Sequence, residues 1–250
     1  MGAVSYSRES DMIQPIVRLG KELAGSGGTD IFAFTECVGN PGVADVVFVE
    51  FDLEAIEMRH RHGIPPLTST VEMRVMYSLE RDTPRDLDAI AAISGFSAGY
   101  IRSKVIKPLV EVGAIIKRDS GYTRSEFFAP VASWIIGVEA KLANWTRGLY
   151  QARRYLRFSD QVYLAVDKAV SKRVIPHSQT MRKQGVGLIL VDSETDCAQI
   201  ISKPKTKGPL SSADHALVGE RLWFVAKNQN SCPQNFASMD SWDSEVAELL

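Results

Sequence analysis

An apolar run at residues 134–138 leads directly into Glu139, Ala140 and Lys141, and this junction constrains the fold more than any other feature of the chain. Such a run is typical of a buried strand. Because successive side chains of a strand alternate between faces, Glu139 and Lys141 should share one face while Ala140 points to the other. Asp45 stands at the start of a second apolar run. Asp45 and Glu139 can hold a hard divalent cation between them, and Lys141 can orient or deprotonate a water beside it. An ordinary ion pair between Glu139 and Lys141 is the alternative interpretation.

Length and composition favour an intracellular protein. The 250 residues are 45% hydrophobic, which is enough for one large or two modest cores. The three cysteines, Cys37, Cys197 and Cys232, have no Cys-x-x-Cys spacing, so a reducing, cytoplasmic setting is expected rather than a disulfide framework or a zinc ribbon. No apolar run approaches the roughly 20 residues of a membrane span, so no membrane association is expected.

Charge is distributed unevenly along the chain. Residues 1–57 carry 3 Lys/Arg against 10 Asp/Glu, whereas residues 141–183 carry 10 against 2. A block of one sign is often only a solvated face, but here the basic block directly follows the candidate metal site. This order favours a polyanionic partner over a neutral small substrate.

The pattern of elements predicts an α/β fold: a mixed sheet flanked by helices, interrupted by a mainly helical insertion. The α/β core is expected at residues 1–53 and 131–227, the insertion at 54–130 and a polar tail at 228–250. A helix, a hairpin, a strand and a further alternation of helices and strands make up the core in that order.

The predicted insertion resembles a winged helix-turn-helix module, because three helices joined by a tight second turn are followed by a short hairpin. Its third helix should run from Ser97 to Val112, with Pro108 bending it. Residues 96–125 carry 6 basic and 2 acidic residues, which favours contact with DNA over dimerisation or protein docking. The residues expected to contact DNA from this module are Arg102, Ser103, Lys107, Lys117, Arg118, Tyr122 and Arg124.

With a hairpin carrying Asp45 and a strand ending in Glu139, Ala140 and Lys141, the chain resembles the PD-(D/E)xK nucleases, whose restriction-endonuclease-like core cleaves nucleic acids with a metal ion. Ala44 stands where the family name has proline, and the inserted module accounts for the long gap between Asp45 and Glu139. The resemblance implies that Mg²⁺, or Mn²⁺ in its place, binds Asp45, Glu139 and the carbonyl oxygen of Ala140. It also implies that Lys141 positions the attacking water or stabilises charge on the phosphorane.

Three further residues follow from the same resemblance. Glu36 is a candidate third acid. Gln151 and Tyr155 match a Gln-x-x-x-Tyr pair found in the exonuclease branch of the family, and at i and i+4 they would share one helix face. Considered alone, Gln151 and Tyr155 are better explained as ordinary helix residues, with Tyr155 packing on the sheet.

Residues 142–159 contain four arginines and no acid, which favours phosphate contacts by Arg147, Arg153 and Arg154.

The chain is therefore expected to be a Mg²⁺-dependent DNA endonuclease, with a role in restriction or anti-phage defence and a homodimeric state. A DNA-binding regulator or architectural protein with an inactive nuclease-like core is the principal alternative. An RNA-directed nuclease is a further one, because phosphodiester chemistry is the same on both polymers.

Overall fold

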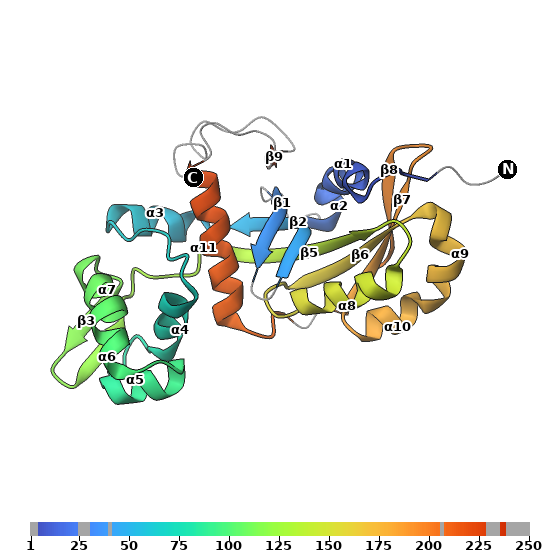
Figure 1. The fold of residues 1–250 in the computed structure, drawn as a ribbon. Helices are drawn as coiled ribbons and strands as arrows, with labels where there is room; N and C mark the ends of the chain where they lie inside the picture. Colours follow the sequence, from blue (N-terminus) through green and yellow to red (C-terminus); the bar gives the residue numbers. More distant parts are fainter. Residues whose placement is uncertain (1–4, 25–30, 40–41, 206–207, 229–235, 239–250) are drawn as a thin grey trace. The chain divides into compact units, whose positions relative to one another are not determined.

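The computed structural model describes residues 5–24, 31–39, 42–205, 208–228 and 236–238, and within these the chain divides into two compact units (Figure 1). The first unit comprises residues up to Phe51, residues 133–211 and the short segment 236–238. The second comprises residues 52–132 and 212–228. Side chains at Lys21, Ala24, residues 36–39, Gly42 and residues 236–238 lie outside the described part.

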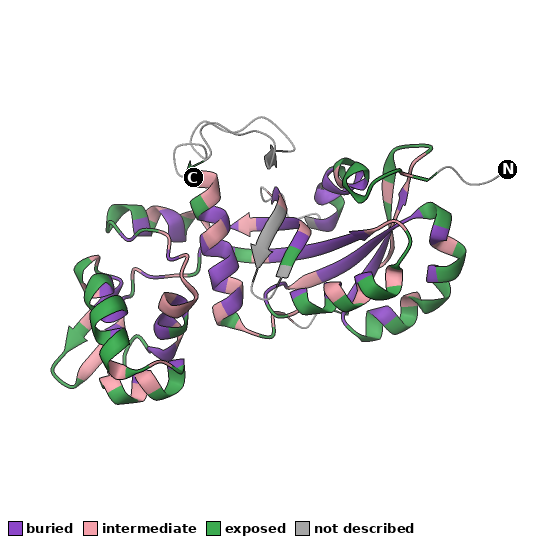
Figure 2. Ribbon diagram, in the orientation of Figure 1, coloured by how far each residue is buried: buried purple, intermediate pink, exposed green. Residues whose placement is uncertain are grey.

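The first unit is built on one mixed sheet with the strand order β8-β7-β6-β5-β2-β1-β9. The strands are β1 (Ile31–Gly39), β2 (Gly42–Phe51), β5 (Ala132–Lys141), β6 (Gln161–Asp167), β7 (Val186–Asp192), β8 (Cys197–Ser202) and β9 (Phe236–Ser238). β5, β6 and β7 run parallel, while β1 with β2, β7 with β8 and β1 with β9 are antiparallel. The central strands are buried on both faces, as expected for the parallel part of a sheet covered by helices (Figure 2).

Helices cover both faces of this sheet. On one side lie η1 (Glu9–Met12), α1 (Ile13–Arg18) and α2 (Gly20–Ala24); on the other lie α8 (Trp145–Tyr155), η3 (Lys168–Val170), α9 (Ser171–Val174), η4 (Ile175–His177) and α10 (Ser178–Lys183) (Figure 1). The segment from η3 to α10 is broken into short turns around Pro176, which has no N–H to donate to a helix. The predicted α/β class, with a mixed sheet flanked by helices, is confirmed.

Strand β5 places its side chains alternately on the two faces of the sheet. Ile136, Val138 and Ala140 belong to the hydrophobic core that includes Ile16 of α1. Glu139 and Lys141 point to the opposite face, where α8 lies. The expected alternation at the end of this strand is therefore confirmed.

The second unit is mainly helical with one two-stranded sheet. Its elements are α3 (Leu53–Arg61), α4 (Thr70–Ser78), α5 (Leu87–Ser94), α6 (Ala98–Ile101), η2 (Arg102–Ile106), α7 (Lys107–Glu111), β3 (Ile115–Arg118), β4 (Gly121–Arg124) and α11 (Ser212–Asn228). Asp52, Ser69 and Asp86 cap the first three of these helices, each accepting a hydrogen bond from a backbone N–H of the first turn.

The expected third helix of this unit contains a π-helical turn. α6, η2 and α7 follow one another without a break, and η2 is the π turn, which ends two residues before Pro108. A proline inside a helix removes one backbone donor and crowds the preceding carbonyl, and a wider turn accommodates both effects.

Helix α11 packs within the second unit rather than the α/β core, where the sequence placed it as part of residues 131–227. Ala216 and Leu217 join the hydrophobic core formed by α4 to α7. Glu220 forms a fully buried ion pair with Arg59 of α3 and accepts a hydrogen bond from Leu67 N at 2.7 Å. An apolar helix face needs a partner, but nothing in its sequence says which core supplies one.

The unit boundaries also differ slightly from the expected ones. The divisions fall between Phe51 and Asp52 and between Ala132 and Ser133, instead of at residues 53/54 and 130/131. Most of the expected polar tail at 228–250 lies outside the described residues, but residues 236–238 form β9 beside β1. No helix among the described residues is long and apolar enough to span a lipid bilayer.

Arg59 is enclosed on several sides. Its guanidinium lies 4.6 Å from the ring centroid of Phe128 and 4.8 Å from that of Trp223, and it donates to Pro65 O at 2.6 Å and to Glu220 Oε2 at 3.0 Å. Removing one member of such a pair leaves the other charge buried and unpaired.

We therefore expect Glu220→Gln to lower the free energy of unfolding of the second unit by about 3–5 kcal/mol. Glu57→Gln, which breaks the exposed pair between Glu57 and Arg61, should cost at most about 1 kcal/mol. Urea denaturation followed by tryptophan fluorescence measures both, because Trp223 lies against Arg59. Equal losses in the two variants would contradict a structural role for the buried pair.

Candidate active site

Asp45 and Ala140 join two neighbouring strands of the sheet. The backbone N–H of Ala140 in β5 donates to Asp45 Oδ2 in β2 at 2.7 Å. This bond fixes the Asp45 carboxylate beside the residues that flank Ala140. Glu139 and Lys141 are the residues on either side of Ala140 in the chain. The three charged residues predicted from sequence, Asp45, Glu139 and Lys141, are therefore brought together.

Lys141 is surrounded by oxygen atoms. Its Nζ lies 2.9 Å from Glu139 Oε1, 2.9 Å from the carbonyl oxygen of Ala140 and 3.0 Å from Glu9 Oε2. Burial disfavours the ammonium form, but the hydrogen bonds to Glu139 and Glu9 outweigh that effect and raise the pKa of Lys141. The side chain is therefore charged at neutral pH.

Tyr155, from α8, fixes the other oxygen of Glu139. Its hydroxyl lies within hydrogen-bond reach of two acceptors, Glu139 Oε2 and the carbonyl oxygen of Val43 at 2.6 Å, which share its single proton. Burial and the neighbouring Glu139 carboxylate both raise the pKa of the Tyr155 phenol, so it remains a donor. With Lys141 on one oxygen and Tyr155 on the other, the Glu139 carboxylate is held at both ends.

Two glycines allow α8 to approach the sheet closely enough for these contacts. A Cβ at Gly148 would lie 2.6 Å from Lys141 Cγ and 2.8 Å from Leu164 Cδ1. A Cβ at Gly137 of β5 would lie 2.9 Å from Ser159 Oγ. The contact between helix and strand therefore requires small residues on both sides.

Asp45 carries an unfavourable charge in this setting. Its pKa is raised to about 6, mainly by burial and further by the carboxylates of Glu139 and Glu9. The hydrogen bond from Ala140 and the charge of Lys141 act in the opposite direction. A cation placed beside Asp45 would offset the burial and the repulsion together.

Glu9 was not among the residues predicted from sequence. It lies in η1 and reaches Lys141 from 132 positions away in the chain. No local pattern marks it, because an acid in the first turn of a helix is common for reasons of helix stability alone. Only the three-dimensional arrangement identifies it.

The other predicted members of the centre have different outcomes. Glu36 lies in β1, but its side chain is outside the described residues. Gln151 lies in α8 four residues before Tyr155, as predicted, and its buried Oε1 has no hydrogen-bond partner among the described residues. A buried amide oxygen without a partner leaves an acceptor available to a ligand.

The donors present suit a hard divalent cation. Asp45, Glu139 and the carbonyl of Ala140 offer oxygen ligands, and Mg²⁺ typically takes one or two carboxylates and completes its shell with waters and substrate phosphates. Among the described residues, no group of three or more His, Cys, Asp or Glu side chains is arranged to hold a metal. The described residues therefore do not form a complete protein cage, and an ion at this position would need waters or substrate to complete its shell.

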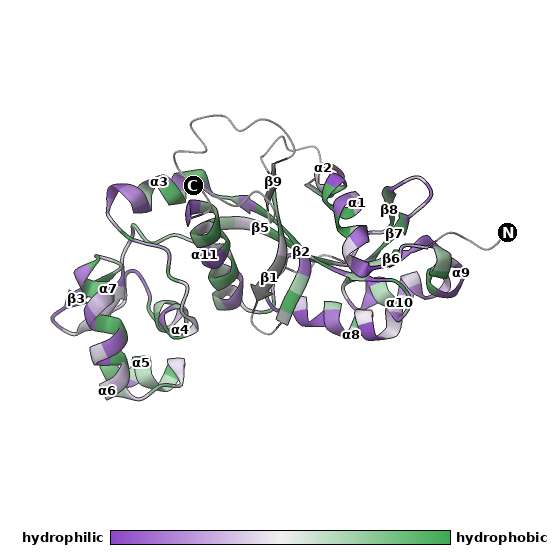
Figure 3. Cartoon of the chain, turned by 45° about the horizontal axis from the view of Figure 1, so that its top comes forward, coloured by the Kyte–Doolittle hydropathy of each residue, from purple (hydrophilic) through white to green (hydrophobic). Residues whose placement is uncertain are grey.

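The residues predicted to contact DNA from the second unit differ in exposure. Arg102, Ser103, Lys107, Lys117 and Arg118 are exposed, and Tyr122 and Arg124 are half-buried. Three of them make contacts within the unit: the Ser103 hydroxyl donates to Gly99 O at 3.0 Å, Arg118 Nε donates to Thr123 Oγ1 at 3.4 Å, and Arg124 lies 5.5 Å from the ring centroid of Tyr77. In the first unit, Arg147, Arg153 and Arg154 are exposed on α8, whose outer surface is strongly hydrophilic (Figure 3).

Comparison with protein-family models, with curated proteins and with solved structures found no match for this chain. Its function must therefore be inferred from the chemistry of its own side chains.

The raised pKa of Asp45 makes this residue a source of instability above pH 4. An acid whose folded-state pKa exceeds its unfolded value binds more protons when folded, so stability falls as pH rises from about 3.8 to about 6 and stays lower above that. We expect Asp45→Asn, measured in EDTA by urea unfolding, to raise the free energy of unfolding at pH 8 by roughly 1–2 kcal/mol after allowance for solvent screening. The gain should shrink towards zero at pH 4. A variant less stable than the wild type at pH 8 would show that the carboxylate is not strained.

Proposed function

We propose that this protein is a metal-dependent nuclease that hydrolyses phosphodiester bonds in DNA, with a restriction-endonuclease-like first unit and a winged-helix second unit. The observation that carries the proposal is the meeting of Asp45, Glu139 and Lys141 at one place on the sheet, with Ala140 N–H bonded to Asp45. Two carboxylates, a carbonyl oxygen and an ammonium group together form a set suited to an anionic phosphodiester with a poor leaving group.

In this proposal Asp45, Glu139 and the carbonyl of Ala140 hold Mg²⁺, or Mn²⁺ in its place. The bound ion would neutralise charge on the attacked phosphate and stabilise the leaving oxygen. Lys141 contributes its own positive charge to the phosphoryl oxygens or orients the attacking water. Because the pKa of Lys141 is raised, its ammonium form favours these roles over proton abstraction. Tyr155 acts as a positioning residue, since it holds Glu139 and not the substrate.

The second unit would supply DNA binding. Its α6, η2 and α7 form one helical segment with Arg102 and Lys107 exposed, and the hairpin of β3 and β4 exposes Lys117 and Arg118. In a winged-helix arrangement the helix enters a groove and the hairpin contacts the backbone. Hydrolysis of both strands would be served by a homodimer, and a cytoplasmic restriction or anti-phage role suits such an enzyme.

One observation favours a second candidate, a DNA-binding protein whose nuclease-like core is silent. Lys141 Nζ donates to the carbonyl oxygen of Ala140 and forms an ion pair with Glu139. These are two of the three proposed metal ligands. Metal binding therefore requires the ammonium group to move. RNA as the substrate is the third possibility, and the same assay distinguishes all three.

The first test is cleavage of plasmid, linear and single-stranded DNA and of RNA in Mg²⁺, Mn²⁺ or EDTA. We expect metal-dependent cleavage of DNA, reduced by at least about 10²-fold in Lys141→Ala because charge stabilisation at the phosphate is lost. DNA affinity in EDTA should be unchanged. Lys168→Ala, which removes an exposed lysine paired with Asp192, is the matched control and should cut normally. Cleavage by Lys141→Ala at the wild-type rate would show that the active site lies elsewhere.

The role of the second unit is tested separately. Arg102→Ala combined with Lys107→Ala should weaken binding to duplex DNA and reduce the slope of log K against log salt by roughly 1.8, the value for two lost phosphate contacts. Arg61→Ala with Arg81→Ala removes the same charge from exposed positions of the same unit and should leave the slope nearly unchanged. Equal effects of the two pairs would indicate a general charge effect instead of a binding helix.

A further inference from the structure

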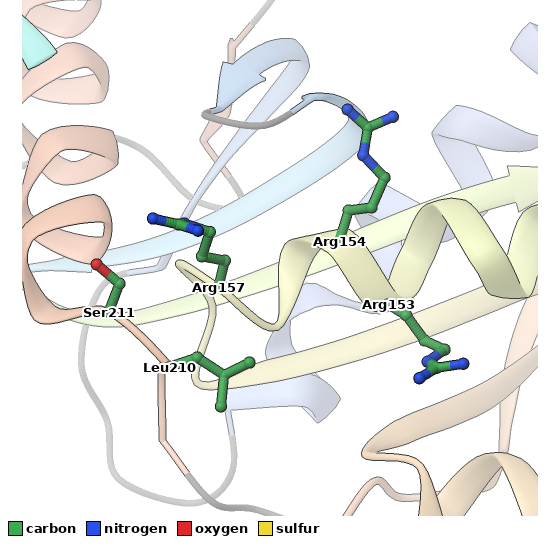
Figure 4. Close-up of a pocket in the computed structure, with 5 residues that line it drawn as sticks. All are labelled: Arg153, Arg154, Arg157, Leu210 and Ser211. Atoms are coloured by element: carbon green, nitrogen blue, oxygen red, sulfur yellow. The ribbon is translucent and has the colours of Figure 1, made fainter.

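A surface pocket of about 510 Å³ lies at the carboxyl end of α8, within the first unit (Figure 4). Its lining residues are Arg153, Arg154, Arg157, Leu210 and Ser211. The wall opposite the helix is held in place by the backbone, since Leu210 N donates to Leu156 O and Ser211 N donates to Arg157 O, both at 3.0 Å. The pocket is therefore formed by the folded first unit itself and does not depend on flexible side chains alone.

Three of the five residues that line the pocket are arginines, and this positive charge favours binding of an anion. Arg153 and Arg154 are exposed, and their side chains form no hydrogen bond or ion pair within the part of the chain that the structure describes. Three like charges within five residues repel one another. The helix dipole favours basic residues in the last turn of α8, but Arg157 lies beyond its end at Tyr155. Helix stability therefore does not account for all three arginines.

The arrangement fits an extended strand better than a single compact anion. Arg157 extends towards Ser211, whereas Arg153 and Arg154 leave the helix in different directions (Figure 4). Leu210 is 74% exposed at the edge of the pocket and offers an apolar surface to a sugar or base. Arginines directed to several points beside an apolar side chain match a chain of phosphates and nucleosides.

We infer that this pocket binds the sugar-phosphate backbone of one strand of the nucleic-acid substrate, independently of the second unit. The inference rests on the proposed function for its substrate class. The pocket lies on the same helix as the candidate centre, since Arg154 directly precedes Tyr155, whose hydroxyl contacts Glu139. No aromatic or amide side chain lines the pocket, so the contact should not depend on base sequence.

The test uses the full chain in EDTA, where no metal-dependent cleavage occurs, and measures binding of a fluorescein-labelled single-stranded 12-mer by anisotropy over a range of salt concentrations. Arg153→Gln with Arg154→Gln should reduce affinity at low salt by roughly tenfold and lower the slope of log K against log salt by about 1.4, as for two lost contacts to a single strand. Two unrelated base sequences should be affected equally. Lys172→Gln with Arg173→Gln, exposed on α9, is the charge-matched control and should change the slope little.

Several results would overturn the inference. An equal effect of the α9 control pair would mean that only total charge matters. An unchanged slope in the α8 variant would place the strand elsewhere. Displacement of the 12-mer by inorganic pyrophosphate or ATP at concentrations similar to its own would make the pocket a site for small phosphorylated ligands. Failure of the nuclease proposal is distinguished by the cleavage assay on Lys141→Ala, because strand binding in EDTA requires no catalysis.

Discussion

The hydrogen bond from Ala140 N–H to the Asp45 carboxylate is the interaction on which the candidate site depends. It links two adjacent strands, β2 and β5, through one side chain and one backbone group at 2.7 Å. Because Ala140 points into the apolar core on the α1 face, Glu139 and Lys141 must both point to the α8 face. A change of one residue in the alignment of β5 would send the charged pair into the apolar core and Ala140 to the α8 face. Burial of the strand therefore enforces the geometry of the site.

Charge explains why a cation should matter at this position. Three carboxylates, from Glu9, Asp45 and Glu139, surround the single ammonium of Lys141. That excess of negative charge would repel a phosphodiester. Burial is the main cause of the raised pKa of Asp45, and the Glu139 and Glu9 carboxylates add to it. In the proposed function a bound divalent cation would reverse the local sign, and the arginines at the end of α8 would add positive charge outside the acidic centre. In the proposed function, metal dependence and phosphate binding would both follow from this charge distribution.

The sequence predicted local features well and long-range ones poorly. Alternation along β5 and the hairpin of β1 and β2 follow from local sequence pattern, and the structure has both. Glu9 could not be predicted, because its contact with Lys141 spans 132 positions. The sequence also assigned α11 to the α/β core within residues 131–227, whereas the structure places it in the second unit. The π turn before Pro108 was expected only as a bend, since the sequence does not specify how the backbone absorbs a proline.

The connection between the two units explains how the insertion leaves the sheet intact. Asp52 N donates to Val131 O at 2.9 Å, so the first and last residues of the inserted segment lie together. β2 and β5, which flank the insertion, are neighbours in the sheet, and the segment between them therefore acts as a long loop closed at its base.

Residues 52–132 do not, however, contain the whole core of the second unit. Without α11, Arg59 would lose the carboxylate of Glu220 and the stacking ring of Trp223, leaving a buried charge unpaired. The inserted segment and the C-terminal helix are thus one folding unit, although 79 residues of the first unit separate them in the sequence.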